Sequence, residues 1–171
     1  MNPDQISAVY DLVSGKIEES EFCARYGRKP SEFPAEAEQL MSAALANHDA
    51  DTVEIALILG FRFGFRESIV DQIHTTLVQP WHVSHENMIG ILQKMKNPGS
   101  VTHLRAAIEL KPKLLYLDHD DYGSYYKKCL WALADIGTPE AITTIEKFVG
   151  SGDPVLREQA SYRLQRLGSI G

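Results

Sequence analysis

The sequence from Tyr125 to Gly168, YYKKCLWALADIGTPEAITTIEKFVGSGDPVLREQASYRLQRLG, decides the fold because it encodes three short helices in a row. Gly137 follows the first apolar stripe, at a position that favours a left-handed C-terminal cap. Thr138 and Pro139 then supply an N-cap and a first helical residue, and Asp153 precedes another proline. Helices of this length are not stable alone, so we expect an all-α scaffold in which they pack on one another.

The same stretch resembles the HEAT-like repeat family, in particular short bacterial repeats similar to those of phycobilisome lyases. Two patterns carry the resemblance: A-L-x-x-I-G-T-P-E-A-I from Ala132, and D-P-x-x-R-x-x-A-x-x-x-L-x-x-L-G from Asp153 to Gly168. The resemblance implies a right-handed α-solenoid of two-helix repeats. It implies little about activity, because such repeats serve many unrelated functions.

Similar helix starts recur near Gly64, Gly99 and Gly137, at separations of 35 and 38 residues. These separations are typical of two-helix solenoid repeats. We therefore predict one domain over all 171 residues, with a helical N-terminal extension over 1–33 and HEAT-like repeats over 34–168. Chance similarity between amphipathic helices is the alternative explanation of the upstream copies.

One segment is ambiguous between helix, loop and strand. Leu59, Phe61, Phe63 and Phe65 alternate with glycine and arginine, which is strand spacing. No second strand pattern exists elsewhere in the sequence to pair with it. We therefore favour a helix end followed by an apolar loop over residues 59–66.

The composition favours a cytoplasmic protein without a cofactor. No apolar run reaches the ~20 residues that a membrane span needs, and the first residues show no secretory pattern. Cys23 and Cys129 have no metal-ligand spacing, so we expect reduced thiols.

The charge is placed unevenly along the sequence. Residues 1–60 carry 11 acidic and 4 basic side chains, a net charge of −7, whereas the remainder carries 12 acidic and 13 basic ones, a net charge of +1. Phosphate binding needs clusters of basic side chains, so the acidic part argues against nucleic acid as a ligand. It favours a basic protein partner, and ordinary solubility is the alternative reason for it.

The sequence does not favour catalysis. It has no Gly-x-Ser-x-Gly elbow, phosphate-binding loop or dinucleotide fingerprint. His82, His85 and Glu86 are the densest set of potential metal ligands, but Ser84 is expected to cap a helix and to leave His82 in the preceding loop. We predict no metal site there.

The acidic loop around residues 118–122 lacks the glycine and the distal glutamate of a calcium loop. Tyrosine offers a large contact area and carboxylates pair with basic partners, so this loop is the predicted contact site. An inter-repeat loop whose tyrosines, such as Tyr125 and Tyr126, pack into the core is the alternative. Asp120→Ala is expected to change stability by less than about 0.5 kcal/mol. The predicted partner-binding residues are Asp118, His119, Asp120, Asp121 and Tyr122 of the loop, Trp81, and Glu67, Asp71, His74 and Arg105 of the expected concave face.

These observations predict a non-catalytic protein-binding module. Its size, acidity and repeat pattern resemble those of bacterial immunity proteins, and that resemblance implies a toxin partner, such as a basic toxin domain, with no nucleic acid or membrane involved. The alternatives are an enzyme on a HEAT fold (bilin lyase-like, DNA glycosylase-like or metal-dependent hydroxylase-like) and a structural adaptor. The sequence leaves the oligomeric state open.

Overall fold

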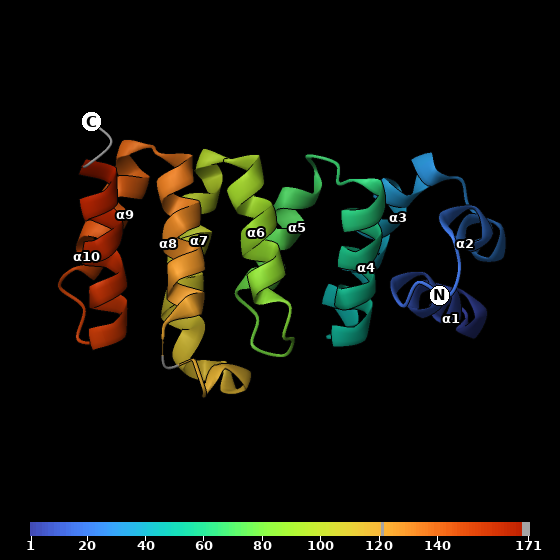
Figure 1. Ribbon diagram of the computed structural model, residues 1–171, viewed down its shortest axis with the longest axis horizontal. Helices are drawn as coiled ribbons and strands as arrows, with labels where there is room; N and C mark the ends of the chain where they lie inside the picture. Colours follow the sequence, from blue (N-terminus) through green and yellow to red (C-terminus); the bar gives the residue numbers. More distant parts are fainter. Residues whose placement is uncertain (121, 169–171) are drawn as a thin grey trace. The chain divides into compact units, whose positions relative to one another are not determined.

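The computed structural model describes residues 1–120 and 122–168, and within this part the chain is helical without strands (Figure 1). The α-helices are α1 (Pro3–Val13), α2 (Glu19–Tyr26), α3 (Phe33–Asn47), α4 (Ala50–Phe63), α5 (Ile69–Leu77), α6 (His85–Met95), α7 (Val101–Leu110), α8 (Ser124–Ile136), α9 (Pro139–Phe148) and α10 (Pro154–Gly168). Short 3-10 turns are η1 (Pro30–Glu32), η2 (Pro98–Ser100), η3 (Lys111–Lys113) and η4 (Leu115–Leu117). The predicted all-α class is confirmed. Its finer description as a right-handed solenoid of repeats stays a prediction.

The chain divides into two compact units, Met1–Gln72 and Ile73–Gly171. We call them the first and the second unit. The division falls inside α5 and differs from the predicted boundary between residues 33 and 34.

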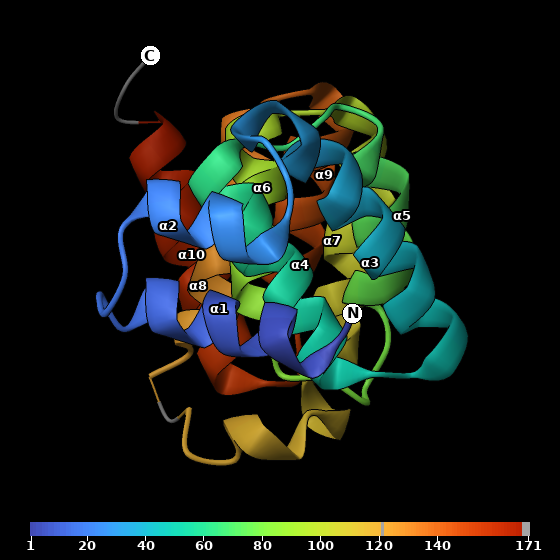
Figure 2. The ribbon, with the colours of Figure 1, turned by 90° about the vertical axis from the view of Figure 1, so that its right-hand side faces the viewer.

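In the first unit, the α1–α2 hairpin runs across the direction of α3 and α4 (Figures 1 and 2). An aromatic cluster joins the two hairpins. The Phe33 ring lies 5.2 Å from the centroids of Phe22 and Tyr26 and 4.2 Å from that of Phe63. Phe22 and Phe33 are fully buried. The predicted N-terminal extension therefore shares its core with α3 and α4.

The ambiguous segment 59–66 is a helix end followed by a loop, as favoured from the sequence. Helix α4 continues through Phe63, and Gly64 ends it with a φ of 99°. The Phe65 ring then folds back onto α4 where Gly60 leaves room for it: a methyl group on Gly60 would overlap that ring. The alternation of aromatic and small residues thus reflects packing of the loop on the helix.

In the second unit, α6, α8 and α10 lie side by side in one layer, with α7 and α9 behind them (Figure 1). The predicted local signals are confirmed here. Gly137 caps α8 with a φ of 67°, and the Thr138 hydroxyl accepts a 3.2 Å hydrogen bond from the Ala141 amide at the start of α9. Leu133 is fully buried between these layers. No helix in the described part of the chain is long and apolar enough to cross a membrane.

Candidate partner-binding site

The segment between α7 and α8 displays large apolar side chains to solvent. It projects beyond the ends of both helices in Figure 1. Leu115 is 75 % exposed, Tyr116 40 % and Tyr122 90 %. Asp118 and His119 are also exposed, whereas Asp121 lies outside the described residues. We call the set Leu115, Tyr116, Asp118, His119 and Tyr122 the recognition surface.

Asp120, in the same segment, has a structural role instead. Its carboxylate accepts hydrogen bonds from the Ser124 amide (2.7 Å), the Ser124 hydroxyl (2.8 Å) and the Tyr125 amide (3.2 Å). The ammonium of Lys111 lies 3.7 Å from it, and both side chains are largely buried. The carboxylate thus satisfies otherwise unpaired amides at the start of α8. The carboxylate that was predicted to contact a partner is therefore largely buried, and we now expect its removal to lower stability.

Two buried histidines lie behind Tyr116. The rings of His82 and His85 stack with centroids 4.0 Å apart, and both side chains are essentially inaccessible to solvent. Their Nε2 atoms donate to backbone carbonyls, His82 to Thr76 and His85 to Gln79, each at 2.8 Å. The Nδ1 atoms are therefore acceptors in the neutral rings.

Both Nδ1 atoms have donors. The Ser84 amide donates to His82 at 3.1 Å, and the Tyr116 hydroxyl donates to His85 at 3.0 Å. Burial lowers the pKa of both rings, that of His85 to about 4 with a further contribution from His82, so both are neutral near pH 7. His82 lies in the loop before α6, as expected, and all four ring nitrogens are engaged within the protein.

His74 was expected to be an exposed contact residue, and the structure corrects this. It is only 7 % exposed, its Nε2 lies 2.8 Å from the Ser100 hydroxyl, and its ring stacks on His103 at 4.0 Å. Trp81 is half-buried and packs edge-on against His82, with ring centroids 5.1 Å apart. Both side chains contribute to packing inside the second unit.

The remaining predicted contact residues are exposed and belong to different units. Arg105 pairs with Glu109 along α7 at 3.5 Å. Glu67 and Asp71 lie at the surface of the first unit, whereas Arg105 and the recognition surface belong to the second.

The structure supports the alternative interpretation of Tyr125 and Tyr126, in which their side chains pack into the core. Both are buried in the second unit. The Tyr125 hydroxyl donates to the Ala107 carbonyl at 3.2 Å, and the Tyr126 hydroxyl donates to the Asp153 carboxylate at 2.8 Å. Only Tyr116 and Tyr122 of this tyrosine-rich stretch remain available to a partner.

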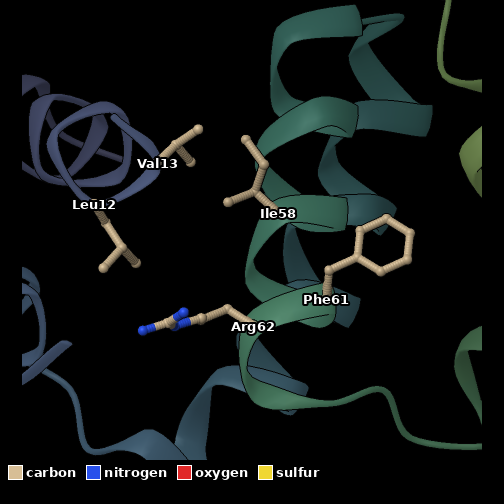
Figure 3. Close-up of a pocket in the computed structure, with 5 residues that line it drawn as sticks. All are labelled: Leu12, Val13, Ile58, Phe61 and Arg62. Carbon is tan, nitrogen blue, oxygen red and sulfur yellow. The ribbon is translucent and has the colours of Figure 1, made fainter. Parts of the chain in front are cut away.

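Surface hollows formed by described residues were missed from the sequence. A groove of about 330 Å³ in the first unit lies between α1 and α4 (Figure 3). It is lined by Leu12, Val13, Ile58, Phe61 and Arg62. The available signal was a second apolar stripe on α4, because Ile58 and Phe61 are one turn apart on the side away from the buried Ala56. A pocket of about 310 Å³ in the second unit is lined by Gln93, Ser124, Lys127, Lys128 and Trp131.

Neither a metal-binding cluster nor an activated thiol is found among the described residues. Over 1–120 and 122–168, no group of three or more His, Cys, Asp or Glu side chains is placed to hold a metal ion. Burial raises the pKa of the Cys129 thiol, and burial together with Glu19 raises that of Cys23. Both thiols are therefore protonated near pH 7 and are poor nucleophiles.

Comparison of the chain with protein-family models, curated proteins and solved structures finds no match. The resemblance to HEAT-like repeats and to immunity proteins therefore rests on the sequence patterns alone.

Proposed function

We propose that the protein is a non-catalytic protein-binding module that contacts its partner through the recognition surface. The observation that carries the proposal is the exposure of Leu115 and Tyr122, at 75 % and 90 %, in a segment that is otherwise anchored. Covering such side chains removes apolar area from water, and aromatic anchors dominate the energetics of many interfaces.

The recognition surface is held in place before any partner arrives. Asp120 ties the segment to the start of α8 and to Lys111, and Tyr116 is tied to the buried His85. The Gln159 side-chain amide on α10 donates to the Tyr122 carbonyl at 3.4 Å. A segment ordered in advance loses less conformational entropy on binding, which favours affinity.

Within this function, neutralisation of a basic toxin domain by an immunity protein is the narrower proposal. It is supported by the acidic first unit, which would speed the encounter with a basic partner, and by the carboxylate of Asp118 beside the exposed tyrosines. A structural adaptor would use the same surface with another partner.

We also propose that the helices form a right-handed α-solenoid of HEAT-like repeats. The starts of α5, α7 and α9 follow the predicted repeat starts near Gly64, Gly99 and Gly137, and successive helices from α6 to α10 alternate between two layers. In such an array, exposed positions such as Arg105 would extend the contact surface.

Site-specific photo-crosslinking tests the binding function. A photo-reactive phenylalanine replaces Tyr122 in one variant and, as a matched control, Tyr162 of α10, which is 48 % exposed. We expect a cellular partner to be trapped at position 122 and not at 162. Equal trapping at both positions, or none at 122, would contradict the proposal.

The immunity function is tested by co-expression with the product of the adjacent open reading frame. We expect that product to be toxic alone and to be neutralised by the wild-type chain but not by Leu115→Ala/Tyr122→Ala. A neighbour that is neither toxic nor bound argues against the immunity function, while binding of another protein at position 122 would still support the general one.

A further inference from the structure

We propose that the groove between α1 and α4 of the first unit binds a basic amphipathic helix of a partner protein. The lining residues of the groove all belong to Met1–Gln72, whereas the recognition surface consists of residues of Ile73–Gly171, so the two sites share no residue. The two proposals can therefore fail independently.

The shape and lining of the groove suit the apolar face of a helix. Leu12 and Ile58 are half-buried and form its floor, while Val13 is 60 % exposed and Phe61 49 %. Figure 3 shows Ile58 on the side of α4 that faces α1, with Leu12 and Val13 opposite it. A hollow of about 330 Å³ accommodates two or three aliphatic side chains, the number that one face of a short helix presents at i, i+3 or i+4, and i+7.

The one basic residue in the lining does not repel a basic ligand. The Arg62 guanidinium extends toward α1 in Figure 3, and its Nε lies 3.0 Å from the Glu19 carboxylate. The charge of Arg62 is thus balanced by a residue of the same unit. Because Arg62 is paired in this way, carboxylates determine the charge of the surface around the apolar part of the groove.

The carboxylates of Asp51 and Glu54 lie on the same face of α4 as Ile58. Asp51 and Glu54 are exposed two turns and one turn before Ile58, respectively, at spacings that place them on its side of the helix. The first unit as a whole has 13 acidic and 6 basic side chains, a net charge of −7. Lysines and arginines flanking the apolar face of a ligand helix would meet this charge.

The negative charge of the first unit also distinguishes among the possible ligands of the groove. A second copy of the chain would bring two units of net charge −7 together, and an acidic helix would meet the same repulsion. Anionic lipid and nucleic acid are disfavoured for the same reason. A basic amphipathic helix is the occupant that satisfies both the apolar lining and the surrounding carboxylates.

The probe is a fluorescent peptide of about 18 residues with leucines along one helical face and lysines on the others. A second peptide has the same composition with the leucines distributed around the helix, and a third has glutamate in place of lysine. We expect the full-length wild-type protein to bind only the first, with an affinity that falls as salt rises.

Two pairs of variants separate the apolar and the charged contributions. Val13→Ala/Phe61→Ala should weaken binding of the first peptide by about tenfold or more, because each side chain covers apolar area of the ligand. Asp51→Asn/Glu54→Gln should weaken it by roughly three- to tenfold and reduce its salt dependence. The matched controls in the second unit are Tyr162→Ala for the first pair and Glu140→Gln/Glu146→Gln for the second.

Equal binding of the first two peptides would overturn the proposal, because charge alone would then explain it. Unchanged affinity in Val13→Ala/Phe61→Ala would overturn it as well, and so would equal binding of the glutamate peptide. All four replaced side chains are exposed, and thermal melting checks that the variants fold. Leu115→Ala/Tyr122→Ala should bind the peptide with wild-type affinity. A failure of the groove proposal can therefore be distinguished from a failure of the proposal for the recognition surface.

Discussion

The two units share helical secondary structure but differ in what stabilises them and in what they expose. The first carries a net charge of −7 over 13 acidic and 6 basic side chains, and the second +1 over 10 acidic and 11 basic ones. The first is centred on the aromatic rings of Phe22, Tyr26, Phe33 and Phe63. The second buries polar groups, including the stacked pair His82 and His85.

This difference indicates a division of roles. The Phe rings of this core have no polar groups, and the Tyr26 hydroxyl donates to the Glu36 carboxylate at 3.2 Å, so few buried polar groups link the interior of the first unit to its charged surface and its apolar groove. In the second unit, the recognition surface is attached to buried polar groups through Tyr116 and Asp120. Changes in that interior are therefore expected to reach the surface.

The largest expected effect is the loss of the aromatic cluster. Phe33→Ala should lower the free energy of unfolding by about 3–5 kcal/mol, because it leaves a cavity among three other rings. Hydrogen exchange should report this mainly in the first unit. Leu133→Ala, at about 2–5 kcal/mol, should act mainly in the second. Equal loss of protection in both units from either change would show that they do not unfold separately.

Acid should weaken the second unit more than the first. The pKa of His85 in the folded protein is about 4, below the ordinary 6.5, so the unfolded chain binds the proton more readily. This stabilisation is complete above pH 6.5 and is lost as the pH falls toward 4. The loss from His85 is roughly 2 kcal/mol at pH 5.

Denaturant titrations from pH 7.5 to 4.5 measure this pH dependence. His85→Phe keeps an aromatic ring in the stack without a titrating group, so its stability should depend less on pH. If the stability of His85→Phe depended on pH as strongly as that of the wild type, the assignment of His82 and His85 as a neutral buried pair would be contradicted.

A smaller effect is expected from the cap of α8. Asp120→Ala should cost about 1–2 kcal/mol, because it leaves the amides of Ser124 and Tyr125 without their acceptor. Asp118→Ala, in the same segment but exposed, should stay within about 0.5 kcal/mol. Chemical denaturation of the two variants distinguishes the structural carboxylate from the surface one, and equal effects would remove the distinction.

The smallest effect on stability is expected at the recognition surface itself. Leu115→Ala/Tyr122→Ala should change the free energy of unfolding by less than about 0.5 kcal/mol, because both side chains are mostly in water already. Thermal melting measures this. A large loss would show that the two side chains pack within the protein rather than await a partner.

Short-range patterns in the sequence were sufficient to predict most helix ends. Gly137 and Thr138 act through neighbours within four residues, and the end of α4 at Phe63 follows from one glycine and one apolar loop. The all-α class followed from such signals. The division into two units did not, because it depends on which helices share a core.

The candidate site was predicted less well, for physical reasons that a single sequence does not show. The contact of Tyr116 with His85 joins residues 31 positions apart, and His74 packs against Ser100 of η2 and His103 of α7. The acidic loop was correctly placed between helices, but an exposed carboxylate and a capping one, Asp118 and Asp120, look alike in sequence.

Equilibrium binding of the crosslinked partner to wild type, Leu115→Ala/Tyr122→Ala and Tyr162→Ala tests the central claim most directly. We predict that the affinity of the double variant falls by about thirtyfold or more, since two well-placed anchors commonly contribute over 2 kcal/mol, and that Tyr162→Ala binds like wild type. Equal affinity of all three proteins would contradict the assignment of the recognition surface as the partner-binding site.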